Sequence, residues 1–235
     1  TFGNTVIEYT VIRSRRRKKT IGITLDPGEG VLVAVPDDAP ADRIRQVVLK
    51  RAGWIITQAT QEVLRPHRKQ FLSGESLPYL GRQVRLFVEH QNTRRTTVRF
   101  DHWSFRIAVP ASMEDGKRRA AIEAAVVAWY KARAQDRLSQ RAARWAEIAG
   151  WSPSQVIIRD QSQRWGSCSP DGILRFNWRI VMASPALIDY VVVHELVHLK
   201  IRTHSPLFWA EVSRLMPDYQ LRRAALREIG ARLTI

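Results

Sequence analysis

Cysteine and long apolar runs are nearly absent from this sequence. Its 235 residues include one cysteine, Cys168, so a disulfide within the chain is impossible and a reducing compartment is the simpler expectation. No uninterrupted apolar run approaches the roughly 18 residues of a membrane span, and no signal-peptide core follows the basic stretch near the N-terminus. These absences predict a cytoplasmic protein with no membrane partner.

Acidic residues are scarce relative to basic ones. The chain has 38 Lys and Arg against 22 Asp and Glu, a formal net charge of +16. Such an excess favours polyanions, with a binding constant that falls as salt rises. No zinc finger or RNP box is present, so the charge predicts non-specific nucleic-acid binding at most, and a solvated basic surface explains it equally well. The basic clusters are Arg13 to Lys19, Arg94-Arg95, Lys117 to Arg119 and, near the C-terminus, Arg222, Arg223, Arg227 and Arg232.

Histidine is also rare, and three of the six histidines lie within one window of eleven residues. The segment His194-Glu195-Leu196-Val197-His198 is followed by His204. On a helix, residues four positions apart share one face, so the imidazoles of His194 and His198 can converge on one ion. Zinc hydrolases use three protein ligands and leave a fourth position for water, whose pKa falls to about 7. The pattern predicts a hydrolytic metal centre in which Glu195 takes the proton of that water.

The flanking residues place this segment on a buried helix. Ser184 is a preferred N-cap residue and Pro185 suits the first helical position, and the run from Ala186 to Leu199 is mostly apolar. Two core histidines beside a surface glutamate are the alternative. That alternative is disfavoured, because a mostly apolar helix would then carry three polar groups without a partner ion.

His204 meets the other two histidines only if the helix ends between them. Six residues beyond His198, a continuing helix would have turned by about 240° and risen by about 9 Å. Proline disfavours helix in the residue before it and can start a new helix, so Ser205-Pro206 predicts a break, with a bend near Ile201 to Thr203. The rival third ligand is Glu211, since zinc sites with two His and one Glu are also common.

Several motifs of the C-terminal half resemble one family of peptidases. They are Arg164-Trp165-Gly166-Ser167-Cys168, Phe176-Asn177-Trp178-Arg179, Asp189 to Val193, the HELVH segment and His204 to Trp209. With these motifs, the segment from Gln161 to Trp209 resembles the YgjP-like metallopeptidase family, which is similar to the WLM and SprT-type proteases. The resemblance extends over nearly the full length and implies a minimal zincin core. It implies His194, His198 and His204 as zinc ligands and Glu195 as the catalytic acid and base.

The expected reaction is metal-assisted hydrolysis of a polypeptide substrate. Glu195 would take the proton of the attacking water and return it to the departing amine. Stabilisation of the developing oxyanion has three candidates, Arg164, Tyr190 and Tyr219. The strand Ile173 to Asn177, or its hairpin partner, is expected to pair with an extended substrate, although an ordinary interior strand is at least as compatible with the sequence.

Other assignments of the same residues stay open. Imidazole ligands also accept nickel and other divalent ions, so the ligand type alone does not select zinc. Cys168 can be a thiolate fourth ligand, although a small buried hydrophobic residue is favoured. A non-catalytic nucleic-acid-binding protein with a structural metal is the alternative function, disfavoured because structural zinc sites usually close four protein ligands. Similarity to WLM and SprT-type proteases also raises the hypothesis of a protease that acts near DNA.

The predicted fold class is α+β. Residues 1–112 are expected to form a small mixed β domain with a helix, and residues 117–235 a zincin-like metallopeptidase domain. The predicted strands are Thr5 to Arg13, Lys19 to Leu25, Val31 to Pro36, Val84 to Glu89, Thr96 to Phe100, Ser104 to Val109, Val156 to Arg159 and Ile173 to Trp178. The predicted helices are Asp42 to Leu64, Lys117 to Ala149, Ala186 to Leu199 and one on each side of Met216-Pro217-Asp218.

Overall fold

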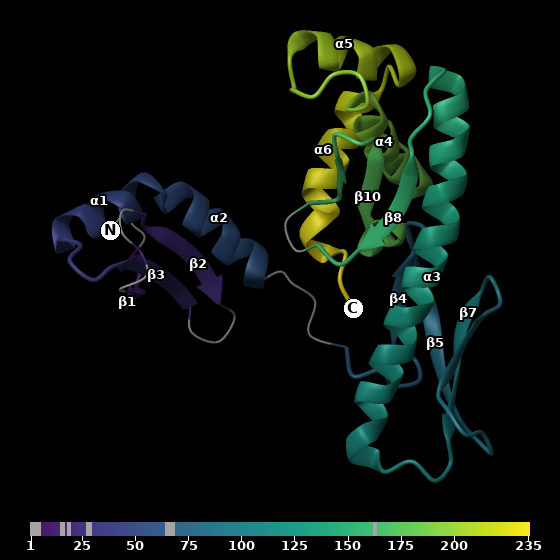
Figure 1. Ribbon diagram of the computed structural model, residues 1–235. Coiled ribbons are helices and arrows are strands. Elements are labelled where there is room, and N and C mark those ends of the chain that lie inside the picture. The colour runs from purple at the N-terminus through teal and green to yellow at the C-terminus, as the bar shows by residue number, and fades with distance from the viewer. Residues whose placement is uncertain (1–5, 15–16, 18–19, 27–29, 64–68, 162–163) are drawn as a thin grey trace. The chain divides into compact units, whose positions relative to one another are not determined.

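The chain forms an α+β fold in which small sheets are packed against helices, as predicted. The computed structural model describes residues 6–14, 17, 20–26, 30–63, 69–161 and 164–235 (Figure 1). The fold separates into two compact units that meet in sequence between residues 65 and 66. Among the described helices, none has the length and apolar character needed to cross a membrane.

The first unit is a three-stranded sheet with two helices. The central strand β3 pairs in parallel with β1 and antiparallel with β2. Its core joins Val33 and Val35 of β3 to Ile44 and Val48 of the first helix and Ile55 of the second. The elements are β1 (Tyr9–Ser14), β2 (Gly22–Asp26), β3 (Gly30–Pro36), α1 (Ala41–Lys50) and α2 (Ala52–Val63).

The single helix predicted from Asp42 to Leu64 is wrong, because the structure has two helices there. The break falls at Arg51, whose backbone has φ −102° and ψ 5°. Neither proline nor glycine occupies position 51, and the apolar spacing continues across it, so the sequence carries no local signal for the break. The last predicted residue, Leu64, lies outside the described residues, as do Thr5 and Lys19 of the predicted strands.

The second unit begins with a four-stranded sheet in the order β4-β5-β7-β6. Strands β5 and β7 run parallel, and the outer pairs are antiparallel. Alternation along these strands buries one face, which includes Leu86, Phe105 and Ile107, each with no exposed surface. The strands are β4 (Ser76–Tyr79), which the sequence analysis did not predict, β5 (Arg82–Gln91), β6 (Thr97–Phe100) and β7 (Ser104–Pro110).

The tip of the β4–β5 hairpin is fixed against the segment that precedes the helix carrying His194. Leu80 and Gly81 both have positive φ, 49° and 79°, the backbone that two-residue hairpin turns require. Their amides donate to the carbonyls of Val181 and Met182 at 2.9 and 3.0 Å. A Cβ added at Gly81 would lie 3.0 Å from the Cα and Cβ of Ser184. Only glycine therefore allows this close approach without strain.

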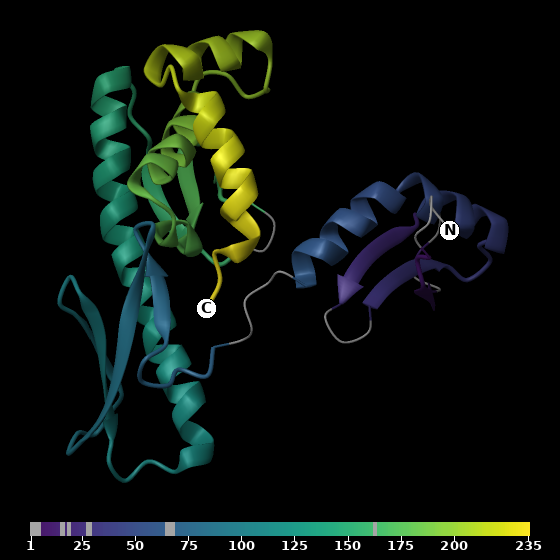
Figure 2. The same cartoon turned by 180° about the vertical axis from the view of Figure 1, so that it is seen from behind.

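A long helix, α3 (Asp115–Ala149), connects the two sheets of this unit (Figure 1). Figure 2 shows the same helix from the opposite side. Its buried side chains recur at every fourth position, from Ile122 to Ala146. A spacing of four exceeds the helical repeat of 3.6, so this stripe winds around the helix. One end of α3 therefore faces the four-stranded sheet. The other end faces the second sheet of this unit and the helix that carries His194.

The second sheet of this unit and five helical segments complete it. Strand β10 lies between β8, which is parallel to it, and β9, which is antiparallel. The predicted strand ending at Trp178 stops at Asn177 and continues as a 3-10 helix. These elements are β8 (Gln155–Arg159), β9 (Gly166–Cys168), β10 (Ile173–Asn177), η1 (Trp178–Met182), α4 (Pro185–Val197), α5 (Pro206–Leu215) and α6 (Tyr219–Ile229), followed by η2 (Gly230–Arg232).

One hydrophobic core runs through the whole second unit, from Phe71 to Leu233. The sequence analysis placed a domain division at residues 113–116, which lie inside this unit. The difference has a physical cause: the first sheet buries its apolar face on α3, and its hairpin tip is bonded to η1. The domain limits 1–112 and 117–235 stay a prediction.

Candidate metal centre

Helix α4 carries two of the three histidines on one face. It begins at Pro185, as predicted, although the Ser184 side chain makes no capping hydrogen bond. Nine of its side chains are buried, because α3, α5, α6 and β9 pack around it. The rings of His194 and His198 lie one helical turn apart, with centroids 5.0 Å from each other.

The predicted helix break brings His204 back to this face. Helix α4 ends at Val197 with His198 as its C-cap, and α5 starts at Pro206. The Ser205 side chain caps α5 by accepting a hydrogen bond from the Phe208 amide at 3.3 Å. The intervening turn leaves Nε2 of His204 only 3.0 Å from Nε2 of His194.

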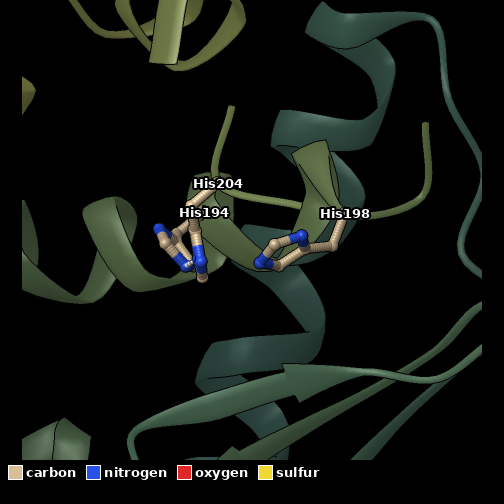
Figure 3. A group of neighbouring side chains, drawn as sticks. All are labelled: His194, His198 and His204. Atoms are coloured by element: carbon tan, nitrogen blue, oxygen red, sulfur yellow. Dashed lines mark hydrogen bonds between the residues drawn. The ribbon is translucent and has the colours of Figure 1, made fainter. Parts of the chain in front are cut away.

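The three imidazoles form a cluster suited to a divalent metal ion (Figure 3). One nitrogen from each ring lies within 4.8 Å of the others. Ligands at about 2.0–2.1 Å in a tetrahedron are spaced about 3.3 Å apart, so the cluster approaches the required size. Nδ1 of His198 lies 3.0 Å from the Ile201 carbonyl, which leaves its Nε2 free to bind a metal.

The protonation states of the cluster also fit a metal. Burial, reinforced by the charges of His198 and His204, lowers the pKa of His194 to about 3. Burial also lowers the pKa of His198, partly opposed by the Ile201 carbonyl. Both rings are therefore neutral near pH 7, and the neutral imidazole is the form that binds metals. The Nε2 atoms of His194 and His204 face each other across 3.0 Å, a separation that suits two ligands of one cation.

Glu195 lies beside the cluster and is almost fully buried. Its side chain is 5% exposed, and it lines the same cavity of about 380 Å³ as all three histidines. Burial raises the pKa of its carboxyl to about 8, partly opposed by the charge of Arg164. A pKa near neutrality suits a group that must both accept and donate a proton. A cation in the cluster would favour its ionised form.

The backbone of β9 leaves the space that Glu195 occupies. A Cβ added at Gly166 would lie 2.6 Å from Cγ and 2.7 Å from Oε1 of Glu195. Real side chains essentially never approach so closely, and backbone pairing of Gly166 with Phe176 keeps β9 in place. Sequence reasoning quoted Gly166 in a motif but did not identify this role, because the contact joins residues 29 positions apart.

We expect Gly166→Ala to lower peptidase activity on the order of 10²-fold, the cost of misplacing a reacting group by about 1 Å. The added methyl group must displace the Glu195 carboxyl, while the histidines keep their positions. The measurement is kcat/KM together with bound metal. Gly116→Ala is the matched control, because no atom lies within 4 Å of a Cβ added there. Full activity of the Gly166 variant at normal metal content would contradict this role.

The competing ligands do not join the cluster. Oε1 of Glu211 pairs with Arg214 at 2.7 Å, and Glu211 is not part of the three-histidine group. Sγ of Cys168 accepts from Arg202 at 3.4 Å, and burial raises the pKa of its thiol, which disfavours a thiolate. Cys168 lines the cavity without entering the histidine group of the described residues.

Comparison with known proteins agrees with this geometry. The model of the family described as YgjP-like, metallopeptidase domain, matches residues 19–229. The chain belongs to the YgjP-like metallopeptidase family. As a member of that family it is a metal-dependent peptidase, acting on polypeptides with a divalent metal ion. The resemblance inferred from the sequence motifs is confirmed, and the alternative of a non-catalytic protein is not supported.

Two solved structures resemble part of this YgjP-like chain. The metallopeptidase zymogen of Pyrococcus abyssi abylysin is 21% identical, covers 41% of this chain and 99% of its own, and gives a TM-score of 0.37. The metallopeptidase zymogen of Methanocaldococcus jannaschii jannalysin is also 21% identical, covers 37% of this chain and 94% of its own, and gives a TM-score of 0.31. No curated protein matched the sequence.

Proposed function

We propose that this YgjP-like protein is a zinc peptidase in which His194, His198 and His204 hold the metal and Glu195 transfers the proton. The observation that carries the proposal is the convergence of three imidazole nitrogens within 4.8 Å beside a buried carboxyl group. Three protein ligands leave one position open, as catalytic zinc sites do. Zinc is favoured because a site of three imidazole ligands suits it, and it has no competing redox chemistry.

The ion and the residues beside the histidine cluster have separate tasks. The ion, when bound, supplies Lewis-acid polarisation of the scissile carbonyl and of the attacking water. Glu195 accepts the proton of that water and delivers it to the departing amine. Arg164 lines the cavity beside Glu195 and remains a candidate for oxyanion stabilisation, as does Tyr190 in the adjoining cavity. Tyr219 is less suited, because it stacks on Trp209 at 5.4 Å and is not among the residues that line either cavity.

The strand that accepts the substrate is β9 in this proposal. Strand β10 pairs with β8 on one side and β9 on the other, so of the two predicted candidates Ile173–Asn177 has no free edge for a substrate. Its hairpin partner β9 is the edge strand of this sheet, and Gly166, Ser167 and Cys168 line the histidine cavity. An extended peptide can add to that edge through main-chain hydrogen bonds.

Removal of the metal tests the proposal. The purified protein is stripped with a chelator, dialysed and assayed on a mixed peptide library before and after one equivalent of zinc. We expect cleavage to vanish on stripping and to return with zinc, and elemental analysis to show one zinc per chain. Magnesium is the control ion, because it prefers oxygen ligands and should restore nothing. Undiminished cleavage by the stripped protein would rule out metal-dependent hydrolysis.

Nucleic-acid binding remains a separate proposal supported by charge. Arg94 and Arg95 are exposed between β5 and β6, whereas Arg13 donates to the carbonyls of Asp37 and Ala39 and is partly engaged. Arg17 of the same run donates to the Thr20 hydroxyl at 3.4 Å, and Arg15, Arg16, Lys18 and Lys19 lie outside the described residues. Binding to DNA should weaken steeply with salt, and no binding at moderate salt would remove the proposal together with activity near DNA.

A further inference from the structure

A second cavity adjoins the histidine cluster and is rich in arginine. Its volume is about 290 Å³, and Glu195 is the one acidic residue among the described residues that line it. We call it the arginine cavity. Helix α4 contributes Tyr190, His194 and Glu195 to its lining. Helix α6 contributes Arg223 and Arg227, and the segment before β9 contributes Arg164. Because His194 and Glu195 line both cavities, a group held here lies beside the site of hydrolysis.

The charges of this cavity are not neutralised within the described part of the chain. Arg222 and Arg214, on α6 and α5, pair with Asp218 and Glu211 at 2.9 and 2.7 Å. No such carboxylate lies within 4.0 Å of Arg223 or Arg227 among the described residues. These two are four positions apart on one face of α6, where like charges repel. An anion in the cavity would relieve that repulsion.

Aromatic contacts hold Arg223 close to the histidines. Its guanidinium carbon lies 4.4 Å from the ring centroid of Trp209, a cation–π contact. The Trp209 ring in turn stacks on His204, with centroids 5.7 Å apart and an interplanar angle of 21°. The position of Arg223 is therefore set by the same residues that build the metal centre.

We propose that the arginine cavity binds a carboxylate of the polypeptide substrate next to the scissile bond. This inference rests on the proposed function. A guanidinium pairs with a carboxylate through two parallel hydrogen bonds, and two arginines leave room for one such group between them. The volume lies at the lower end of the roughly 300–1,000 Å³ of ligand pockets, which suits a side chain. The carboxylate comes either from an acidic side chain or from a free C-terminus.

Matched peptides test this specificity. Cleavage sites are first mapped by mass spectrometry in a mixed library, and kcat/KM is then measured for Glu and Gln versions of one amidated peptide. A third version of the peptide has Gln at this position and ends there with a free C-terminal carboxylate. We expect about tenfold faster cleavage of a carboxylate-bearing peptide. Preference for the amidated Glu peptide assigns an acidic side chain, and preference for the free end assigns the C-terminus.

Variants then locate the preference. Arg223→Gln and Arg227→Gln should each bring the ratio of kcat/KM between the preferred carboxylate-bearing peptide and the amidated Gln peptide toward one, because each removes a partner of the carboxylate. Arg232→Gln is the matched control, since it removes an exposed arginine that does not line the cavity. Equal rates for all three wild-type substrates, or a ratio unchanged in both cavity variants, would overturn the proposal.

A binding measurement separates this proposal from the peptidase activity itself. Zinc-loaded Glu195→Gln protein is titrated with fluorescent forms of all three peptides, and anisotropy is recorded. Tighter binding of a carboxylate-bearing peptide than of the amidated Gln peptide, weakened by Arg223→Gln, supports the arginine cavity even if the wild type cleaves no peptide. Cleavage by the wild type with equal binding of all three peptides keeps the peptidase and rejects the cavity.

Discussion

The Glu195→Gln variant should lose peptide hydrolysis by about 10²- to 10⁴-fold, the contribution of a positioned general acid–base group. The amide has nearly the same shape as the carboxyl group and fills the space beside Gly166. It cannot accept the proton of the attacking water. Glu195 is not one of the three proposed metal ligands, although it is next to His194 in sequence. The metal should therefore stay bound in the variant.

Two measurements make this result specific to the chemistry. Elemental analysis should show the same metal content in the variant as in the wild type. Thermal unfolding of the metal-free proteins should show that the variant is at least as stable, because burial disfavours the Glu195 carboxylate and a neutral amide avoids that cost. Unchanged turnover at full metal content would remove Glu195 from the mechanism.

The residues that converge through local chain geometry were predictable from the sequence. The spacing of His194 and His198 indicates one helical face, and Ser205-Pro206 indicates the new helix that returns His204. Both features depend on fewer than a dozen neighbouring residues, and the structure places their nitrogens together. Their assignment as metal ligands stays a prediction until metal binding is measured.

The features that depend on distant contacts were not predictable. Strand β9 has three residues and is a strand only because β10 lies beside it. The space at Gly166 has meaning only because Glu195 fills it. Arg223 and Arg227 appeared in the sequence as part of a basic C-terminal cluster. Their difference from Arg222 depends on which of them finds an acidic partner in the fold.

The packing that joins the two sheets of the second unit shows the same limit. The predicted domain limits at residues 112 and 117 leave a short polar stretch that ends in glycine between them. The two sheets are nevertheless joined by packing on α3 and by hydrogen bonds from the β4–β5 turn to η1, and Gly81 of that turn approaches Ser184 across more than a hundred residues. A glycine in a hairpin turn has an obvious local explanation, so its second role is not visible in the sequence.

His204→Ala should weaken zinc binding by more than the roughly 10- to 100-fold that loss of an outer-shell partner of a metal ligand costs. Two imidazoles on one helix would remain, and a third position of the tetrahedron would be open. Peptide hydrolysis should fall with metal occupancy. The measurements are zinc affinity by competition with a chromophoric chelator, and kcat/KM at saturating zinc.

The matched variant is Glu211→Gln, which tests the rival ligand in the same assay. Glu211 shares an exposed ion pair with Arg214, and such pairs contribute about 0–1 kcal/mol, so the substitution should leave fold and metal affinity unchanged. Because His204 also stacks on Trp209, His204→Ala could act by loosening that ring rather than by removing a ligand. Added free imidazole distinguishes the two causes: it can occupy the vacated position and restore part of the activity, but it cannot repair a displaced helix. Loss of zinc in the Glu211 variant with retention in the His204 variant would instead assign a two-His, one-Glu centre.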